Sequence, residues 1–171
     1  TLARKGIQAI EKKEMPDPEV SLRIVFDMER ASEDEKFLFS QCGNYLIEGG
    51  KNRSQAHAYQ GAYSVRLHAS DPYGLTTRIR VKPGEHFRVS LKRKSMWFSG
   101  KLVVASEDSS ELYKVVQLGP PADQKGWDVL SVCLSIPELQ SRNIVIYAYN
   151  PSLIPASFDD LIIERLREGR D

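Results

Sequence analysis

The chain has 171 residues, the length of one domain, of which 41% are hydrophobic and 27% charged. This composition is typical of a globular protein with enough apolar side chains to bury a core. Its 24 Lys and Arg nearly balance 23 Asp and Glu, and a formal net charge of +1 argues against attraction to nucleic acid or to an anionic membrane through bulk charge. No run approaches the roughly 18 consecutive apolar residues of a membrane helix. We therefore expect no nucleic-acid partner and no membrane insertion within this segment.

The first residues differ from the rest of the chain. Residues 2–13 have the pattern of a short helix that Gly6 weakens, and Pro16 and Pro18 stop any helix there. We predict a linker or lead-in over residues 1–19, helical or irregular, and a single domain over 20–168. A first residue other than Met, without a charged-then-apolar leader, is typical of a processed chain or an excised domain, so we expect it to be part of a larger protein.

After Pro18 apolar and polar residues alternate with a period of two, which is the pattern of half-buried β-strands. Residues with turn propensity, such as Asn150-Pro151, separate the alternating runs, and residues 30–60 are predicted to form a loop with short edge strands. About ten short strands without helices between them predict an all-β fold, an antiparallel β-sandwich or barrel, of which we favour the sandwich. The predicted strands cover residues 21–28, 62–69, 75–82, 86–94, 101–106, 111–118, 127–136, 142–149 and 157–166.

One turn predicts a hairpin. Pro83-Gly84-Glu85 lies between the strands at 75–82 and 86–94, which we therefore expect to pair. Such pairing would place six cationic side chains on one face. This face is either a solvated surface, on which acidic neighbours reduce the repulsion between the cations, or a site for an acidic glycan. These residues are Arg78, Arg80, Lys82, Arg88, Lys92 and Lys94.

Five short motifs occur in an order typical of one group of β-sandwiches. They are Met28-Glu29, Gln60-Gly61-Ala62-Tyr63-Ser64, Val81-Lys82-Pro83-Gly84 with the following His86-Phe87-Arg88-Val89-Ser90, Gly126-Trp127, and Phe158-Asp159-Asp160-Leu161-Ile162. Over residues 20–166 the chain resembles the jelly-roll carbohydrate-binding modules of bacterial glycoside hydrolases, which have a galactose-binding-like fold. Residues 30–56 depart from that pattern, because Phe37 and Phe39 stand where the family often has a Trp.

The resemblance implies a function and a metal. It implies a non-catalytic accessory domain that binds a polysaccharide or glycan and belongs to a larger extracytoplasmic protein. It also implies a structural Ca²⁺ held by Glu29, by Asp159 or Asp160, and by carbonyls around Gly61; oxygen ligands of this kind suit Ca²⁺. The alternative is that the two Asp side chains bond a loop backbone and that Glu29 is solvated.

The sequence carries no catalytic signature. It lacks the HExxH and GxSxG motifs and a glycine-rich phosphate loop, and His57, His68 and His86 are isolated from one another. We therefore expect no enzyme. Two alternatives stay open, a structural or protein-interaction domain of an envelope protein without sugar binding, and a hydrolase or lyase.

Aromatic residues define the candidate ligand site. Trp97 and Phe98 lie between two predicted strands, so we expect them at an exposed loop tip, where flat rings can stack on sugars. We predict that this tip acts together with Arg80, Arg88 and Lys92. Tyr147 and Tyr149 share one face of their strand and are either core residues or part of a sugar-binding platform.

Two cysteines, Cys42 and Cys133, are too few for a disulfide scaffold or a closed zinc site. They form either one bridge or two unpaired thiols.

Overall fold

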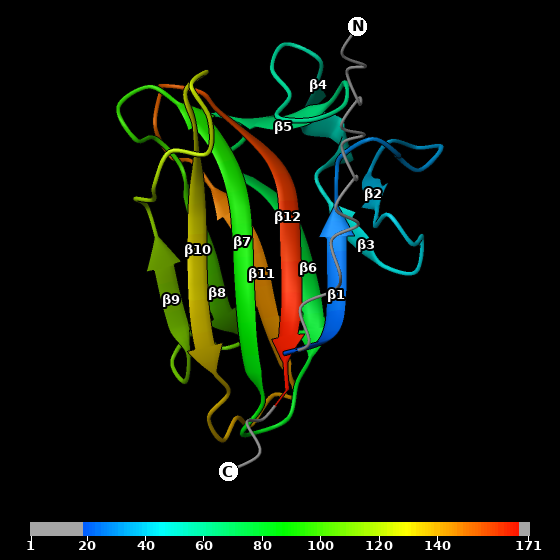
Figure 1. Ribbon diagram of the computed structural model, residues 1–171, viewed down its shortest axis with the longest axis vertical. Helices are drawn as coiled ribbons and strands as arrows, with labels where there is room; N and C mark the ends of the chain where they lie inside the picture. The colour runs from blue at the N-terminus through cyan, green and yellow to red at the C-terminus, as the bar shows by residue number, and fades with distance from the viewer. Residues whose placement is uncertain (1–18, 168–171) are drawn as a thin grey trace, which may run out of the picture.

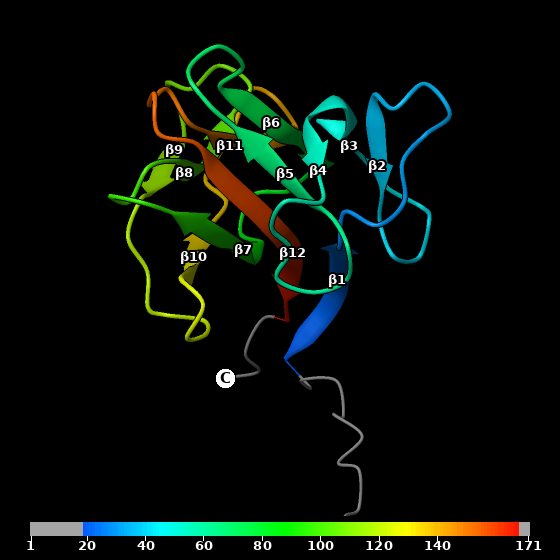
Figure 2. The same cartoon turned by 90° about the horizontal axis from the view of Figure 1, so that it is seen from above.

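The computed structural model describes residues 19–167, so the predicted lead-in lies, except for Glu19, outside the described residues. Within that range twelve strands form two antiparallel sheets, which pack face to face as two layers (Figures 1 and 2). The predicted jelly-roll β-sandwich is confirmed. No helix in residues 19–167 is long and apolar enough to cross a membrane.

The sheet nearer the viewer in Figure 1, here called the front sheet, has the strand order β10-β7-β12-β5-β4. Strand β1 pairs with the C-terminal half of β12, and β5 pairs with its N-terminal end. The front sheet consists of β1 (Val20–Phe26), β4 (Arg53–Ser54), β5 (Ser64–Leu67), β7 (His86–Ser95), β10 (Trp127–Ser135) and β12 (Ala156–Leu166).

The second sheet, here called the rear sheet, has the order β2-β3-β6-β11-β8-β9. A single-turn 3-10 helix, η1 (Gly50–Asn52), follows β3, so the region predicted as loop with short edge strands has that character. The rear sheet consists of β2 (Phe37–Phe39), β3 (Leu46–Glu48), β6 (Tyr73–Arg80), β8 (Lys101–Ser106), β9 (Tyr113–Val116) and β11 (Asn143–Tyr149).

The core lies between the two sheets and follows the alternation of the sequence. In β7, Phe87, Val89 and Leu91 are at most 1% exposed, and the intervening side chains point to the outer face. Each such side chain contributes about 1.5–3 kcal/mol when it leaves water. One inward position of β7 is charged: Arg93 is fully buried and forms an ion pair with Asp128 of β10.

The predicted hairpin between residues 75–82 and 86–94 is wrong, because β6 and β7 belong to different sheets. The turn between them bonds to other segments: the Val81 amide donates to the Arg142 carbonyl, and the Gly84 amide to the Ile136 carbonyl, both at 2.8 Å. These bonds hold the turn as a crossover from the rear sheet to the front sheet.

The crossover also divides the expected cationic stripe. Arg78 and Arg80 lie on the outer face of the rear sheet, whereas Arg88 and Lys92 lie on the outer face of the front sheet. The contacts of Arg78 and Arg88 are acidic: Arg78 lies 3.9 Å from a Glu107 carboxylate oxygen and Arg88 lies 2.9 Å from one of Glu164. A single anionic ligand therefore cannot contact the whole predicted stripe.

Cys42 and Cys133 are both exposed and both are free thiols, so the structure has the two unpaired thiols and no disulfide bridge between them.

Candidate functional site

Four tyrosines gather on the outer face of the rear sheet. Tyr73 is 57% exposed and stacks on Tyr149, with ring centroids 4.6 Å apart and planes inclined by 24°. Its centroid lies 6.0 Å from that of Tyr147, and Tyr113 is 54% exposed beside them on β9. We call Tyr73, Tyr113, Tyr147 and Tyr149 the tyrosine platform.

Strand pairing places these rings together. Tyr149 pairs with Tyr73 of β6, and Tyr147 pairs with Val103 of β8. The residues that alternate with the two β11 tyrosines, such as Ile146 and Ala148, belong to the buried core, so Tyr147 and Tyr149 must point outward.

Asn150 fixes the end of the platform. Its side-chain amide donates to the carbonyls of Leu67 and Ile154, and its backbone amide donates to the carbonyl of Pro72, next to Tyr73. Asn150 is fully buried; its bond to Pro72 holds the end of β11 against the start of β6, and its side-chain bonds tie that end to β5 and to the following loop.

The floor beside the tyrosines is apolar. Val103 and Ala105 of β8 are at most 2% exposed but lie on the outer face, outside the core between the sheets. Partial burial, and then interaction with the neighbouring phenols, raises the pKa of both Tyr147 and Tyr149 above its usual range. Tyr147 and Tyr149 therefore present neutral rings and hydroxyl groups.

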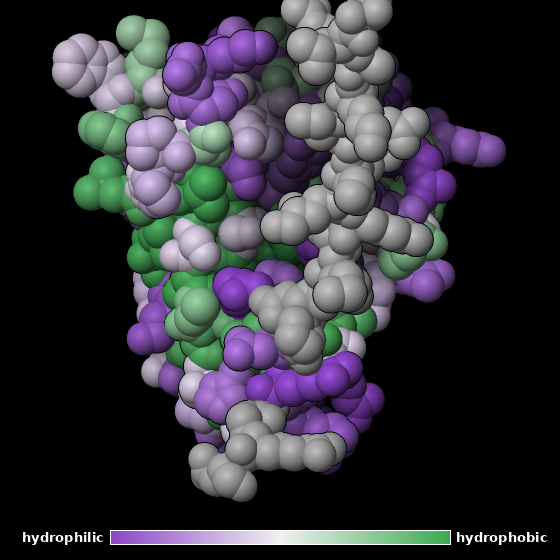
Figure 3. Space-filling view, in the orientation of Figure 1, coloured by the Kyte–Doolittle hydropathy of each residue, from purple (hydrophilic) through white to green (hydrophobic). Residues whose placement is uncertain are grey.

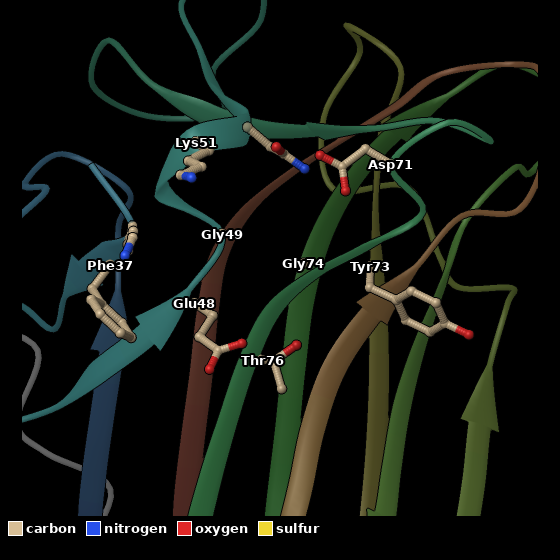
Figure 4. Close-up of a pocket in the computed structure, with 10 residues that line it drawn as sticks. Phe37, Glu48, Gly49, Lys51, Asp71, Tyr73, Gly74 and Thr76 are labelled. Carbon is tan, nitrogen blue, oxygen red and sulfur yellow. The ribbon is translucent and has the colours of Figure 1, made fainter. Parts of the chain in front are cut away.

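A hollow of about 340 Å³ opens beside Tyr73 on the same face. Figure 4 shows the Glu48 carboxylate and the Thr76 hydroxyl close together at its floor, with Phe37 on one side and Tyr73 on the other. Glu48 and Thr76 are paired residues of β3 and β6. The other lining residues are Lys36, Gly49, Lys51, Asn52, Asp71 and Gly74.

This arrangement suits a sugar chain. Stacked aromatic faces can pack against the C–H faces of sugar rings, while carboxylate, hydroxyl and ammonium groups in the hollow can hydrogen bond to sugar hydroxyls. The long outer face of the sheet offers room for several sugar units in a row.

The predicted site residues fall on different surfaces. Tyr147 and Tyr149 are not core residues but lie on the outer face of the rear sheet, and their part in sugar binding stays a prediction. Arg80 is exposed on the outer face of the same sheet, but at the other end of β6 from Tyr73. Arg88 and Lys92 lie on the opposite side of the sandwich, where the Lys92 ammonium is 5.1 Å from the ring centroid of Tyr59.

Trp97 and Phe98 lie at an exposed loop tip, as expected. Trp97 is 80% exposed and Phe98 57% exposed, and both have positive φ angles of 58° and 56°. Their loop joins β7 to β8, and the first residue of β8, Lys101, has its ammonium 5.6 Å from the Tyr149 ring centroid. The tip is thus joined to the platform by three residues, and its part in binding stays a prediction.

Sequence reasoning missed Tyr73 and Tyr113. Tyr73 directly follows Pro72 and precedes the predicted strand, and Tyr113 lies in a short strand whose other residues are partly exposed. The alternation of β9 could have placed Tyr113 and Val115 together on one exposed face, but the proximity of Tyr73 to Tyr149 depends on the pairing of β6 with β11.

The residues expected to hold calcium meet around the loop before β5. A Glu29 carboxylate oxygen accepts hydrogen bonds from the amides of Ala62 and Tyr63, both at 3.0 Å. Asp159 is fully buried and accepts from the amides of Tyr59 and Gln60. Asp159 therefore bonds the loop backbone as the alternative interpretation describes, whereas Glu29 also bonds the loop instead of being solvated.

Their oxygens fit calcium only in part. Among residues 19–167 no three His, Cys, Asp or Glu side chains group into a metal site, and the carboxylates of Glu29 and Asp159 are occupied by amide donors. Burial and the neighbouring Asp160 raise the pKa of Asp159 to about 7, and burial also raises that of Asp160. Calcium at this corner stays a prediction.

Comparisons with known proteins show the fold. No protein-family model and no curated protein matches the sequence. Among solved structures, a xylan-binding family 22 carbohydrate-binding module of Paenibacillus barcinonensis is 15% identical with a TM-score of 0.55, over 85% of this chain and 96% of that one. A second family 22 module, from Clostridium thermocellum, is 15% identical with a TM-score of 0.52, over 92% of this chain and 100% of the module.

A family 35 module of Cellvibrio japonicus is 9% identical with a TM-score of 0.52, over 87% of this chain and 99% of that one. At such identities the likeness is one of fold. The chain has the jelly-roll fold of carbohydrate-binding modules, as the sequence motifs predict.

Proposed function

We propose that this chain is a non-catalytic glycan-binding module, an accessory domain of a larger extracytoplasmic protein, which binds a polysaccharide on the tyrosine platform. The observation that carries the proposal is the exposed stack of Tyr73 on Tyr149 beside a polar hollow. Exposed stacked rings add little to the stability of the fold, because polar residues could occupy the same surface positions. They do match the apolar faces of sugars.

The rings would act as the apolar floor for two or more sugar units, and the groups in the hollow would select their hydroxyls. Glu48 accepts hydrogen bonds, Lys51 donates them, and Thr76 and Asn52 can do both. Affinity should be modest, because most of the sugar chain stays in water and each polar contact replaces one with water.

The fold supports the proposal, since the three solved structures described above are all carbohydrate-binding modules, one of them described as xylan-binding. A purely structural domain would instead be expected to bury its aromatic residues. Exposure of Tyr73 therefore favours a binding role over a purely structural one.

The test is a glycan-array screen of the parent chain with and without Ca²⁺, followed by titration of the best ligand with Tyr149→Ala. Loss of one stacked ring should weaken binding by about 1–2 kcal/mol, while Tyr149→Phe keeps the ring and should bind within a few-fold of the parent. Absence of binding to every glycan, or equal binding by Tyr149→Ala, would refute the proposal.

A further inference from the structure

The hollow beside Tyr73 is the first of three that adjoin one another. A second hollow, of about 420 Å³, shares Lys51 and Asn52 with it, and a third, of about 450 Å³, shares Arg66 and Pro155 with the second. The series leads from the outer face of the rear sheet over the end of the sandwich to the outer face of the front sheet. We call the second and third hollows together the rim trough.

The rim trough is lined by cationic groups without acidic ones. Among residues 19–167, no Asp or Glu lines either of its hollows, although Glu48 and Asp71 line the hollow beside Tyr73. Within the same part of the chain, none of the side chains of Lys51, Arg66 and Lys94 makes an ion pair. The cationic and titratable lining residues are Lys51, Arg53, His57, Arg66, His68 and Lys94.

Strand register places two of these cations beside each other on the front sheet. Arg66 of β5 and Lys94 of β7 both pair with Ser157 of β12, so they flank it on the outer face. Strands in a sheet are about 4.8 Å apart, which puts the two backbones about 10 Å from each other. Ser157 is small and buried, and it leaves the space between the two cations open.

Both cations line the same hollow, so an anion bound between them would be attracted by the two charges together. Figure 3 looks onto this face and shows hydrophilic side chains at both its upper and lower ends, on either side of a more hydrophobic middle part over β10 and β7. Three cations that make no ion pair within residues 19–167, Lys51, Arg66 and Lys94, therefore line the adjoining hollows at this end of the sandwich.

We propose that the rim trough binds the negatively charged groups, carboxylate or sulfate, of an anionic polysaccharide whose chain continues from the tyrosine platform. This inference rests on the proposed function, because the platform supplies the contact with the sugar rings. Arg66 can bind such a group through two parallel hydrogen bonds and Lys94 through its point charge. Three adjoining hollows fit an extended polymer better than a single small anion.

The experiment compares the parent chain with an Arg66→Gln/Lys94→Gln double variant on two matched pairs of polymers. The pairs are polygalacturonate with its methyl ester, and dextran sulfate with dextran, and they distinguish carboxylate from sulfate. Lys82→Gln is the control, because Lys82 is exposed on the β6–β7 crossover at the other end of the molecule. Thermal unfolding checks that all variants fold.

We expect the parent to prefer the charged member of at least one pair, with affinity that falls as salt rises, and the double variant to lose about fivefold or more of it. Lys82→Gln should bind as the parent does. The inference is overturned if neither pair shows a preference, if the double variant binds as the parent does, or if single-stranded DNA binds equally well with the same dependence on Arg66 and Lys94.

The array screen separates this failure from that of the proposed function. Suppose that a neutral glycan binds and loses affinity in Tyr149→Ala, while charged polymers bind equally well with and without Arg66 and Lys94. That result would overturn the inference about the rim trough and would leave the proposed function of the tyrosine platform intact. Absence of all glycan binding would overturn both.

Discussion

Tyr73 and Tyr149 are paired residues of adjacent strands, and their rings stack at 4.6 Å on the outer surface of the sheet. They are 76 residues apart in the sequence, one at the start of β6 and the other at the end of β11. Antiparallel pairing brings these two ends together, and the backbone amide of Asn150 holds them there by donating to the carbonyl of Pro72. The candidate site is therefore a direct product of the strand order.

Arg93 should be the most important single charge for stability. Its side chain is fully buried, pairs with Asp128, and donates to the carbonyls of Gly100 and Gln117 at 2.7 Å. Arg93→Met leaves the partly buried Asp128 and these carbonyls without a donor, which should lower the free energy of unfolding by about 3–5 kcal/mol. Urea denaturation measures the change.

Arg78→Gln is the matched control, because it removes the exposed ion pair with Glu107 and should cost less than about 1 kcal/mol. Equal losses in the two variants would show that the buried network contributes nothing beyond a surface charge.

Asp159 should make stability depend on pH. Its pKa is raised to about 7 by burial and by Asp160, whereas an unfolded Asp titrates near 3.9. Between about pH 4 and pH 7 the folded chain thus holds a proton that the unfolded chain has released, so the stability contribution falls as the pH rises through this window and levels off above it.

Asp159→Asn keeps an acceptor oxygen for the amides of Tyr59 and Gln60 and removes the titration. In the presence of a chelator, its free energy of unfolding should change less than that of the parent from about pH 5 to about pH 7.5. Parallel profiles for the two proteins would contradict the raised pKa.

Calcium is tested independently of binding. The resemblance predicts that Ca²⁺ raises the melting temperature of the parent relative to a chelator, and that Asp160→Ala loses this response. Ca²⁺ would have to compete with the amides that now bond to Glu29 and Asp159. A parent protein that melts at the same temperature in Ca²⁺ and in chelator has no such site.

Trp97 should be dispensable for folding. Trp97 has 80% of its surface exposed, so Trp97→Ala removes few packing contacts. The melting temperature of the variant should therefore equal that of the parent. If the loop tip stacks on the ligand, as the sequence predicts, the variant loses about 1–3 kcal/mol of binding. A loss below that of Tyr149→Ala would place the tip at the edge of the platform, and an unfolded variant would make Trp97 a core residue.

The sequence predicted the positions of the strands far better than it predicted which strands pair with one another. The alternation of Phe87, Val89 and Leu91 with polar residues located β7 and its buried face, because side-chain direction is a local property of a strand. Pairing is not local: Pro83-Gly84 has the composition of a hairpin turn, and only its bonds to Arg142 and Ile136 make it a crossover.

The site shows the same limit. Tyr147 and Tyr149 were identified from their shared face, but whether that face is core or surface depends on which side of β11 the other sheet covers. Arg93 occupies an inward position, and the alternation of residues within β7 does not indicate that Asp128 of β10 lies opposite it. The jelly-roll fold itself was predictable because each of its turn and core motifs consists of a few consecutive residues.

The most direct test of the central claim is to map a bound oligosaccharide from the array by backbone amide chemical shifts in two-dimensional NMR of the parent chain. The platform predicts the largest shifts at Tyr73, Tyr147 and Tyr149, with further shifts at Glu48 and Thr76 in the adjoining hollow. Shifts confined to Met96–Phe98, or to β7 around Arg88 and Lys92, would contradict it and place the ligand elsewhere on the sandwich.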